Sequence, residues 1–167
     1  KPDPGRTFSL PGSYYAAYKS ALEAHVFAES LSGRSFAIVR PSSVYGIDRV
    51  LSRSRGFDIL QSLREGKPFR LPGWSRWVHV DDVAAAVTLL ASQHAPSGAF
   101  DLVDWYGRHA DWALLAAEVL GIQADITSEG PSGPDHPIIP LAARALGISL
   151  NRGREGIRIH LAELAAL

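Results

Sequence analysis

The sequence predicts an α/β fold built around a largely parallel sheet. Segments with helical periodicity alternate along the chain with short apolar runs, an order typical of strands connected by helices. The clearest of these runs, at residues 36–39, has no polar alternation, which favours a strand covered on both faces. With 167 residues, 46% of them hydrophobic and 20% charged, the chain is long enough and apolar enough to bury a core.

The first helix is expected to begin at Ser13, a residue type that caps helices, and to run to about residue 32. Gly33 is placed to end it in a left-handed conformation. The strand of residues 36–39 follows and ends at Pro41. Residues 1–12 are rich in Pro and Gly and are expected to form a loop. Small and apolar residues share one face of the helix: Ala17, Ala21, Ala24, Ala28 and Leu31.

A second helix is expected over residues 56–65, and the glycine directly after it is a stop signal. Its inward side chains are expected to be Phe57, Leu60 and Leu63. Residues 77–80 are predicted to form a strand that leads to a helix over residues 83–92. Either Asp81 or Asp82 can cap this helix, and acidic side chains also suit the positive end of a helix dipole.

The C-terminal part continues the alternation of strands and helices. Residues 99–103 are predicted to form a strand, and residues 111–120 a helix that Gly121 closes. The remaining expected elements are a short strand at 124–126, a Gly- and Pro-rich loop at 127–138, and helices at about 139–146 and 154–165.

Composition and charge exclude several classes of protein. Lys plus Arg and Asp plus Glu both number 17, so neither a broad basic surface nor a nucleic-acid partner is expected. The absence of Cys removes disulfide scaffolds and thiol catalysis and suits a cytoplasmic protein. No apolar run predicts a membrane span, no signal peptide is visible, and no His-rich zinc motif predicts a metal site. The chain lacks Met and begins Lys1-Pro2, which we interpret as a piece of a longer protein.

The strongest chemical feature is the pair Tyr15 and Lys19, which lie four residues apart and share a face of the first helix. A Tyr hydroxyl titrates near ~10, too high for an efficient base at neutral pH, but a nearby ammonium group favours the phenolate. Such a tyrosine can exchange a proton with a substrate hydroxyl or carbonyl while a cofactor moves hydride. The plain alternative is an amphipathic helix whose lysine stem lies along the apolar face.

Further motifs follow this helix in a fixed order. Arg-Pro-x-x-Val-Tyr-Gly occupies residues 40–46, and Trp-Val-His-Val-Asp-Asp-Val occupies residues 77–83. With the Tyr-x-x-x-Lys helix before them and the segment 146–157 after them, the chain resembles the extended short-chain dehydrogenase/reductases, the NAD-dependent epimerase/dehydratase family. The resemblance covers nearly the whole chain.

The resemblance implies an enzyme that uses NAD or NADP on a sugar-like or other small hydroxyl or carbonyl substrate. Tyr15 matches the catalytic acid/base, and Lys19 matches the lysine that binds the nicotinamide ribose and lowers the tyrosine pKa. Both residues therefore also contact the cofactor. The segment beside the nicotinamide, whose backbone contacts the cofactor in such enzymes, matches Pro41, Ser42, Ser43 and Val44.

The fold implied by the resemblance is the C-terminal part of a doubly wound, Rossmann-like sheet with a smaller substrate-binding region. Residues 1–47 and 77–104 are expected in the cofactor-binding domain, and residues 48–76 and 105–167 in the substrate-binding region. The glycine-rich phosphate-binding turn and the upstream catalytic Ser or Thr of the family are absent from this sequence. We therefore expect the N-terminal half of the same fold as a partner, and expect the isolated chain to be inactive.

Substrate clues come from two departures from the family pattern. Ser43 stands where relatives that act on nucleotide sugars carry Asn, and Ser75 stands where they carry Arg. Because neither hydroxyl can neutralise a phosphate, the sequence predicts a substrate other than a nucleoside-diphosphate sugar. Ser43 and Arg76 are the candidate substrate-binding residues, although alternation along a strand turns Arg76 away from the face of Ser75. Further candidates for lining the substrate cleft are Arg70, Trp74 and Trp77.

A second reading is a non-catalytic descendant of the family that binds a dinucleotide as a sensor or scaffold. The intact Tyr15 and Lys19 pair favours the enzyme, because a pure binder has no use for the acid/base. His79 and Asp82 are expected to be architectural, as a hydrogen-bonded core histidine and a helix cap. A homodimer is among the assemblies that the resemblance implies.

Overall fold

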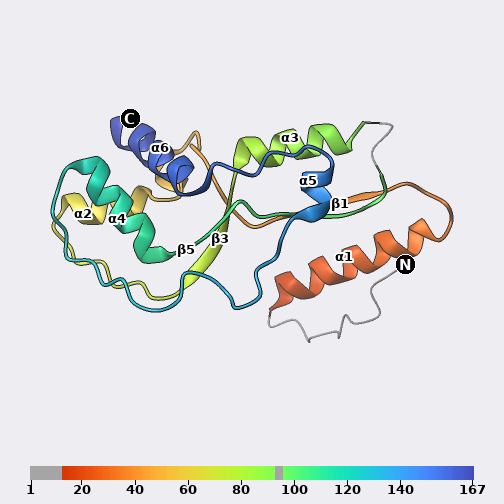
Figure 1. The fold of residues 1–167 in the computed structure, drawn as a ribbon, viewed down its shortest axis with the longest axis horizontal. Coiled ribbons are helices and arrows are strands. Elements are labelled where there is room, and N and C mark those ends of the chain that lie inside the picture. The colour runs from red at the N-terminus through yellow and green to blue at the C-terminus, as the bar shows by residue number, and fades with distance from the viewer. Residues whose placement is uncertain (1–12, 93–95) are drawn as a thin grey trace.

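The computed structural model of the chain describes residues 13–92 and 96–167 (Figure 1). Its helices are α1 (Tyr14–Ser30), α2 (Phe57–Arg64), α3 (Val80–Leu90), α4 (His109–Leu120), α5 (Leu141–Ala145) and α6 (Gly153–Ala166), with a 3-10 turn, η1, at Leu51–Arg53. Its strands are β1 (Ala37–Pro41), β2 (Ser43–Tyr45), β3 (Trp74–His79), β4 (Gly98–Leu102) and β5 (Trp105–Arg108). Within the described residues, no helix combines the length and the apolarity that a membrane crossing requires. The expected loop at residues 1–12 lies outside them.

The strands form two small sheets, so the predicted α/β class with parallel strands is confirmed. β1 pairs with β4 in parallel, with Ala37 opposite Gly98 and Pro41 opposite Leu102. β2 pairs with β3 in parallel, and β3 pairs with β5 in the antiparallel sense. The pairing of β5 was not expected from the sequence, because its short segment carries no clear alternation.

Strand β3 separates two hydrophobic cores, because consecutive side chains of a strand point to opposite faces. Trp77 belongs to the larger core, with side chains from α2, α4 and α6, and Val78 belongs to the smaller core, with side chains from α3, β4 and α5. These two groups of helices lie toward opposite ends of the molecule in Figure 1.

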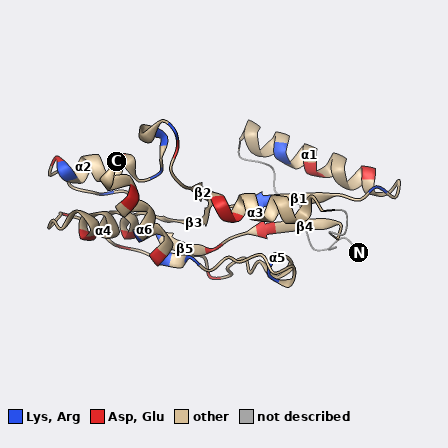
Figure 2. Cartoon of the chain, turned by 90° about the horizontal axis from the view of Figure 1, so that it is seen from above, with Lys and Arg blue, Asp and Glu red and all other residues tan. Residues whose placement is uncertain are grey.

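Helix α1 is held at its ends as predicted but packs less than predicted. Ser13 caps it by accepting a hydrogen bond from the Ala16 backbone, and Gly33 follows it with a φ of 80°. None of its residues is buried, and Figure 2 shows it set apart from the rest of the chain. The prediction that β1 is covered on both faces is therefore wrong for the described residues: the strand is only partly buried, because α1 contributes no buried side chain to it.

The helix boundaries agree with the sequence with one instructive exception. Leu60 and Leu63 of α2 are buried, and α4 ends at Gly121 in the left-handed region. Helix α3, however, begins at Val80, three residues earlier than expected, and neither aspartate caps it. His79 is the cap: its Nδ1 accepts a hydrogen bond from the Asp81 backbone.

Candidate functional site

The chain crosses between its two sheets twice at one place. β1 ends and β2 begins around Ser42, whose backbone N–H donates to the Leu102 carbonyl over 3.0 Å. β4 ends at Leu102, and the Asp104 backbone N–H then donates to the Trp77 carbonyl of β3 over 2.9 Å. The carboxyl ends of the parallel strands β1 and β4 therefore meet at a crossover, the place where open α/β sheets bind ligands.

The crossover carries polar atoms that the protein itself leaves unsatisfied. The Ser42 hydroxyl and Asp104 Oδ1 are buried without a hydrogen-bond partner among the described residues. Buried polar atoms are nearly always paired, so these two are exceptions. Ser42 lies within the segment 41–44, for which the family resemblance implies cofactor contact.

The neighbouring hydroxyls of Ser43 and Ser75 face each other, 3.0 Å apart, and form a hydrogen bond. These are the two positions at which the sequence predicts a neutral site. The structure brings them together and shows that each satisfies the other. Pro41 and Val44, on either side of this segment, are both exposed.

Helix α1 brings Tyr15 and Lys19 together on its exposed surface. Lys19 Nζ lies 5.6 Å from the centroid of the Tyr15 ring, and 73% of Tyr15 is exposed. Among the described residues, no hydrogen bond or ion pair joins either side chain to the segment 41–44. The pair is therefore formed locally and presented to one side of the molecule.

A bidentate ion pair connects this helix to the crossover. Arg40 donates from Nε and Nη2 to the two carboxylate oxygens of Glu23, over 2.9 and 2.5 Å. Glu23 lies one turn after Lys19 on α1, and Arg40 directly precedes Pro41. The hydrogen bond to Glu23 raises the pKa of Arg40. The ion pair therefore fixes the helix relative to the end of β1.

A pocket of about 700 Å³ opens beyond β2, between the 46–56 loop, α2 and the first residues of α4. Its inner wall includes the buried aromatic side chains Tyr45, Trp77 and Trp112. Its charged lining residues are Asp48, Arg53, Arg55, Asp58 and, when protonated, His109. Charged and aromatic walls together suit a polar ligand with one apolar face.

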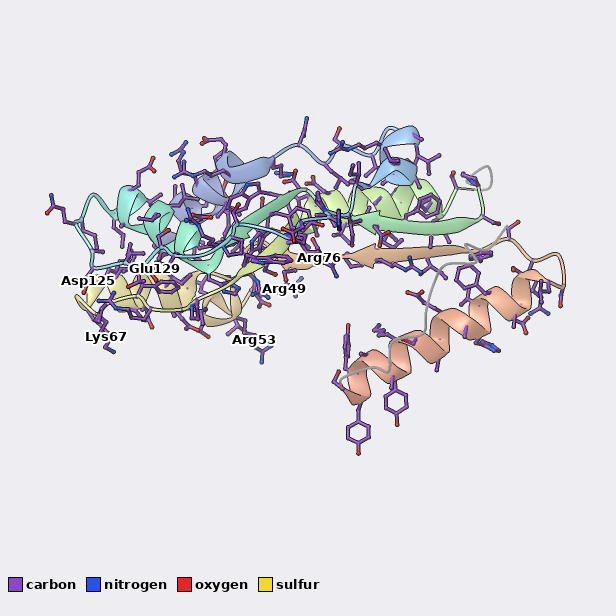
Figure 3. The ribbon with its side chains drawn as sticks, turned by 60° about the horizontal axis from the view of Figure 1, so that its bottom comes forward. Arg49, Arg53, Lys67, Arg76, Asp125 and Glu129 are labelled. Atoms are coloured by element: carbon purple, nitrogen blue, oxygen red, sulfur yellow. The ribbon has the colours of Figure 1, made fainter. Side chains whose placement is uncertain are left out.

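Arg76 does not line this pocket. It is exposed on β3 and turned to the face opposite Trp77, as strand alternation predicts. Figure 3 labels it with Arg49 and Arg53 near the middle of the molecule. The other cleft candidates differ among themselves: Arg70 pairs with Asp125, Trp74 packs on Tyr106, and Trp77 lines the pocket.

The His-Val-Asp-Asp segment acts in the structure as an anchor. Besides the His79 cap, Asp82 accepts two hydrogen bonds from Arg152 Nε, at 2.9 and 3.0 Å. Asp104 Oδ2 accepts from the Gly153 backbone at the start of α6, and burial raises the pKa of this carboxyl. Burial also raises the pKa of Tyr45 far above its usual range. The segment thus ties α3 to α6.

Sequence reasoning missed most of the pocket. Tyr45 was visible as part of the Arg-Pro-x-x-Val-Tyr-Gly motif, but Arg55 and Trp112 belong to no motif. The Ser-Arg-Ser-Arg-Gly run at residues 52–56 is a weak local signal, because it places two arginines, both exposed in the structure, directly before a helix.

Comparisons with known proteins place these features in context. The family model described as the NAD dependent epimerase/dehydratase family matches residues 3–102. No curated protein sequence matches the chain.

Solved structures share the fold at low sequence identity. UDP-glucose 4-epimerase from Thermus thermophilus, solved with NAD, is 22% identical with a TM-score of 0.68; the match covers 97% of this chain and 58% of that one. WbmF from Bordetella bronchiseptica, solved with NAD+ and UDP, is 20% identical with a TM-score of 0.73, covering 96% and 53%. dTDP-glucose 4,6-dehydratase from Bacillus anthracis, solved with NAD, is 15% identical with a TM-score of 0.69, covering 93% and 52%. The chain therefore spans little more than half the length of these neighbours.

Proposed function

Because the chain belongs to the NAD dependent epimerase/dehydratase family, we propose that it is the catalytic-helix half of an NAD(P)-dependent epimerase, dehydratase or oxidoreductase. Its substrate is a sugar-like or other small hydroxyl or carbonyl compound. The observation that carries the proposal is the Tyr15 and Lys19 pair, adjacent on an exposed face of α1 in a chain of this family. UDP-glucose epimerase and dTDP-glucose dehydratase structures with the same fold support the sugar chemistry.

The residues of this chain divide the chemistry as follows. The Tyr15 hydroxyl exchanges a proton with the substrate oxygen. The Lys19 ammonium, 5.6 Å from the centroid of the Tyr15 ring, binds the ribose hydroxyls. A nicotinamide supplies the hydride transfer when bound. The backbone of the segment Pro41, Ser42, Ser43 and Val44 would hold it beside the substrate.

The proposal also assigns each segment of the chain to a cofactor-binding or a substrate-binding region. Residues 1–47 and 77–104 contribute to the cofactor domain, and residues 48–76 and 105–167 form most of the substrate region. The larger hydrophobic core supports this division, because its helices α2, α4 and α6 all lie within residues 48–76 and 105–167. Ser43 and Arg76 are proposed substrate contacts, and the Ser43–Ser75 pair supports a substrate without a diphosphate.

The chain acts with the N-terminal half of the same fold, which carries the phosphate-binding turn, and is inactive without it. A cytoplasmic homodimer completes the proposal, supported by the absence of Cys and by the exposed face of α1.

The test uses the full-length protein that contains this chain and a panel of neutral sugars, uronates, sugar phosphates and nucleotide sugars, followed by NADH absorbance and product analysis. Tyr15→Phe is expected to lower kcat by about 10²–10⁴-fold while NAD affinity stays nearly unchanged. Lys19→Ala is expected to lower kcat and also to weaken the binding of NAD. Tyr18→Phe is the matched control, because Tyr18 is an equally exposed tyrosine on the same helix, 71% against 73%.

Two results would contradict the proposal. Full activity of Tyr15→Phe would show that the tyrosine is only helix surface. NAD binding without turnover of any substrate in the panel would favour the alternative, a dinucleotide-binding sensor or scaffold.

A further inference from the structure

Arg55 is held in place at the pocket by its backbone as well as by its side chain. Its carbonyl accepts a hydrogen bond from Nε2 of the buried His160 over 2.8 Å. Its own Nε donates to the Val44 carbonyl over 3.3 Å, and its guanidinium lies 5.1 Å from the centroid of the Trp77 ring. An arginine stacked on an aromatic ring and fixed at Nε has a defined plane and direction.

The two terminal nitrogens of Arg55 are left for a ligand. Among the described residues, neither makes a hydrogen bond, and no carboxylate lies within ion-pair distance of the guanidinium. Several other arginines in the described part of the chain are paired; Arg40, Arg108 and Arg152, for example, each bind a carboxylate. A fixed guanidinium with both terminal groups free presents the fork that matches a carboxylate or a phosphate.

The pocket wall behind Arg55 lacks acceptors for its own donors. The indole N–H groups of Trp77 and Trp112 are buried and have no hydrogen-bond partner in the part of the chain that the structure describes. Because both nitrogens are buried, the pocket offers a ligand the aromatic rings of these tryptophans and not their N–H groups.

The overall charge of the pocket limits the charge of its ligand. Arg53 and Arg55 are balanced by Asp48 and Asp58, and the Asp48 carboxylate also accepts a hydrogen bond from the Val50 backbone. A nearly neutral pocket with one preoriented arginine suits one anionic group better than the two phosphates of a diphosphate.

We propose that Arg55 determines substrate specificity by binding a single carboxylate or phosphate group of a sugar-like substrate, whose ring lies against the aromatic wall of this pocket. The proposal rests on the proposed function in one respect, that residues 48–76 and 105–167 form the substrate region, from which most of the pocket lining comes. It adds a substrate class and a residue that no motif of the sequence assigns.

The test measures binding to the full-length protein by calorimetry, with no turnover required. The probes are glucose, glucuronate and glucose 6-phosphate, which differ in charge but share the sugar ring. At least one anionic probe is expected to bind about tenfold or more tightly than glucose, which is the gain in affinity expected from one charge-assisted contact. Whichever anion binds more tightly identifies the group as carboxylate or phosphate.

Three variants separate the role of Arg55 from general effects. Arg55→Gln is expected to remove the preference for the anion, and Arg55→Lys, which keeps the charge but not the fork, to retain part of it. Arg49→Gln is the control, because Arg49 is exposed in the same loop and lines neither described pocket; it is expected to change nothing. Circular dichroism shows that each variant is folded.

Several outcomes would overturn the proposal: equal affinity for glucose and both anions, no saturable binding of either anion, or anion binding that survives Arg55→Gln. Tighter, Arg55-dependent binding of UDP-glucose than of both single anions would also contradict it. Tyr15→Phe is expected to keep the anion preference, so a failure of the acid/base proposal remains distinguishable from a failure of this one.

Discussion

The ion pair between Arg40 and Glu23 provides the sharpest test of how the catalytic helix is held. Helix α1 has no buried residue, and its attachment rests on this pair and on the edge-to-face contact of Phe27 with Phe36, at 5.3 Å between ring centroids. The perturbation is a double-mutant cycle of Glu23→Gln and Arg40→Gln, singly and together. Such a cycle isolates the energy of the pair from the other effects of each substitution.

The magnitude follows from the geometry and the burial. Exposed ion pairs contribute about 0.2–1 kcal/mol, and hydrogen bonds to charged groups about 1.5–3 kcal/mol. The Arg40 and Glu23 side chains are 21% and 28% exposed and make two hydrogen bonds, so the pair lies between these limits. We expect a coupling energy of about 1–2 kcal/mol.

The assay is equilibrium urea unfolding of the full-length protein, with Arg34 and Glu29 as the control pair. That pair bonds a residue of the same helix, but its side chains are 75% and 42% exposed, so a coupling below about 0.5 kcal/mol is expected. A coupling for Arg40 and Glu23 no larger than that of the control would refute the reasoning. If α1 carries the acid/base, the Arg40→Gln enzyme also loses kcat, whereas Arg34→Gln does not.

Three further predictions follow from the packing and the charges. Gly56→Ala is expected to destabilise the protein by about 2–4 kcal/mol in urea unfolding, because φ is +94° and the new Cβ would lie 2.7 Å from Leu161 Cδ2. Gly121→Ala, with φ +65° and open space around it, should cost only about 1 kcal/mol, and equal costs would contradict the packing argument. Burial lowers the pKa of His160, so on acidification the unfolded chain binds a proton at this residue at a higher pH than the folded chain does. The free energy of unfolding should therefore fall as the pH drops below about 6.5. The His160→Gln variant should show a flatter dependence of stability on pH between about pH 7.5 and 5.5, and an unchanged dependence would exclude His160 as its source. The 167-residue chain alone should show no NAD binding by calorimetry, because it lacks the glycine turn that binds a pyrophosphate. Binding of NAD at low-micromolar concentration would contradict this prediction.

The sequence by itself determined the features that depend on near neighbours. Ser13 and Gly121 delimit helices because capping and left-handed termination involve only the adjacent turn. The proximity of Tyr15 and Lys19 could be predicted for the same reason, since helical spacing alone places the two side chains together. The family motifs also lie within short segments, which is why the family and the parallel α/β class were predicted correctly.

The tertiary structure alone decided what depends on segments distant in sequence. β2 is too short to show a period, and it exists because β3 supplies its partner 34 residues away, Ser43 against Trp77. His79 became the cap of α3, since its place at the end of β3 turns the ring back to the helix start. The pocket joins Arg55, Trp77 and Trp112 from three separate elements, and no local pattern can encode such a meeting because it arises only when the sheet and helices pack.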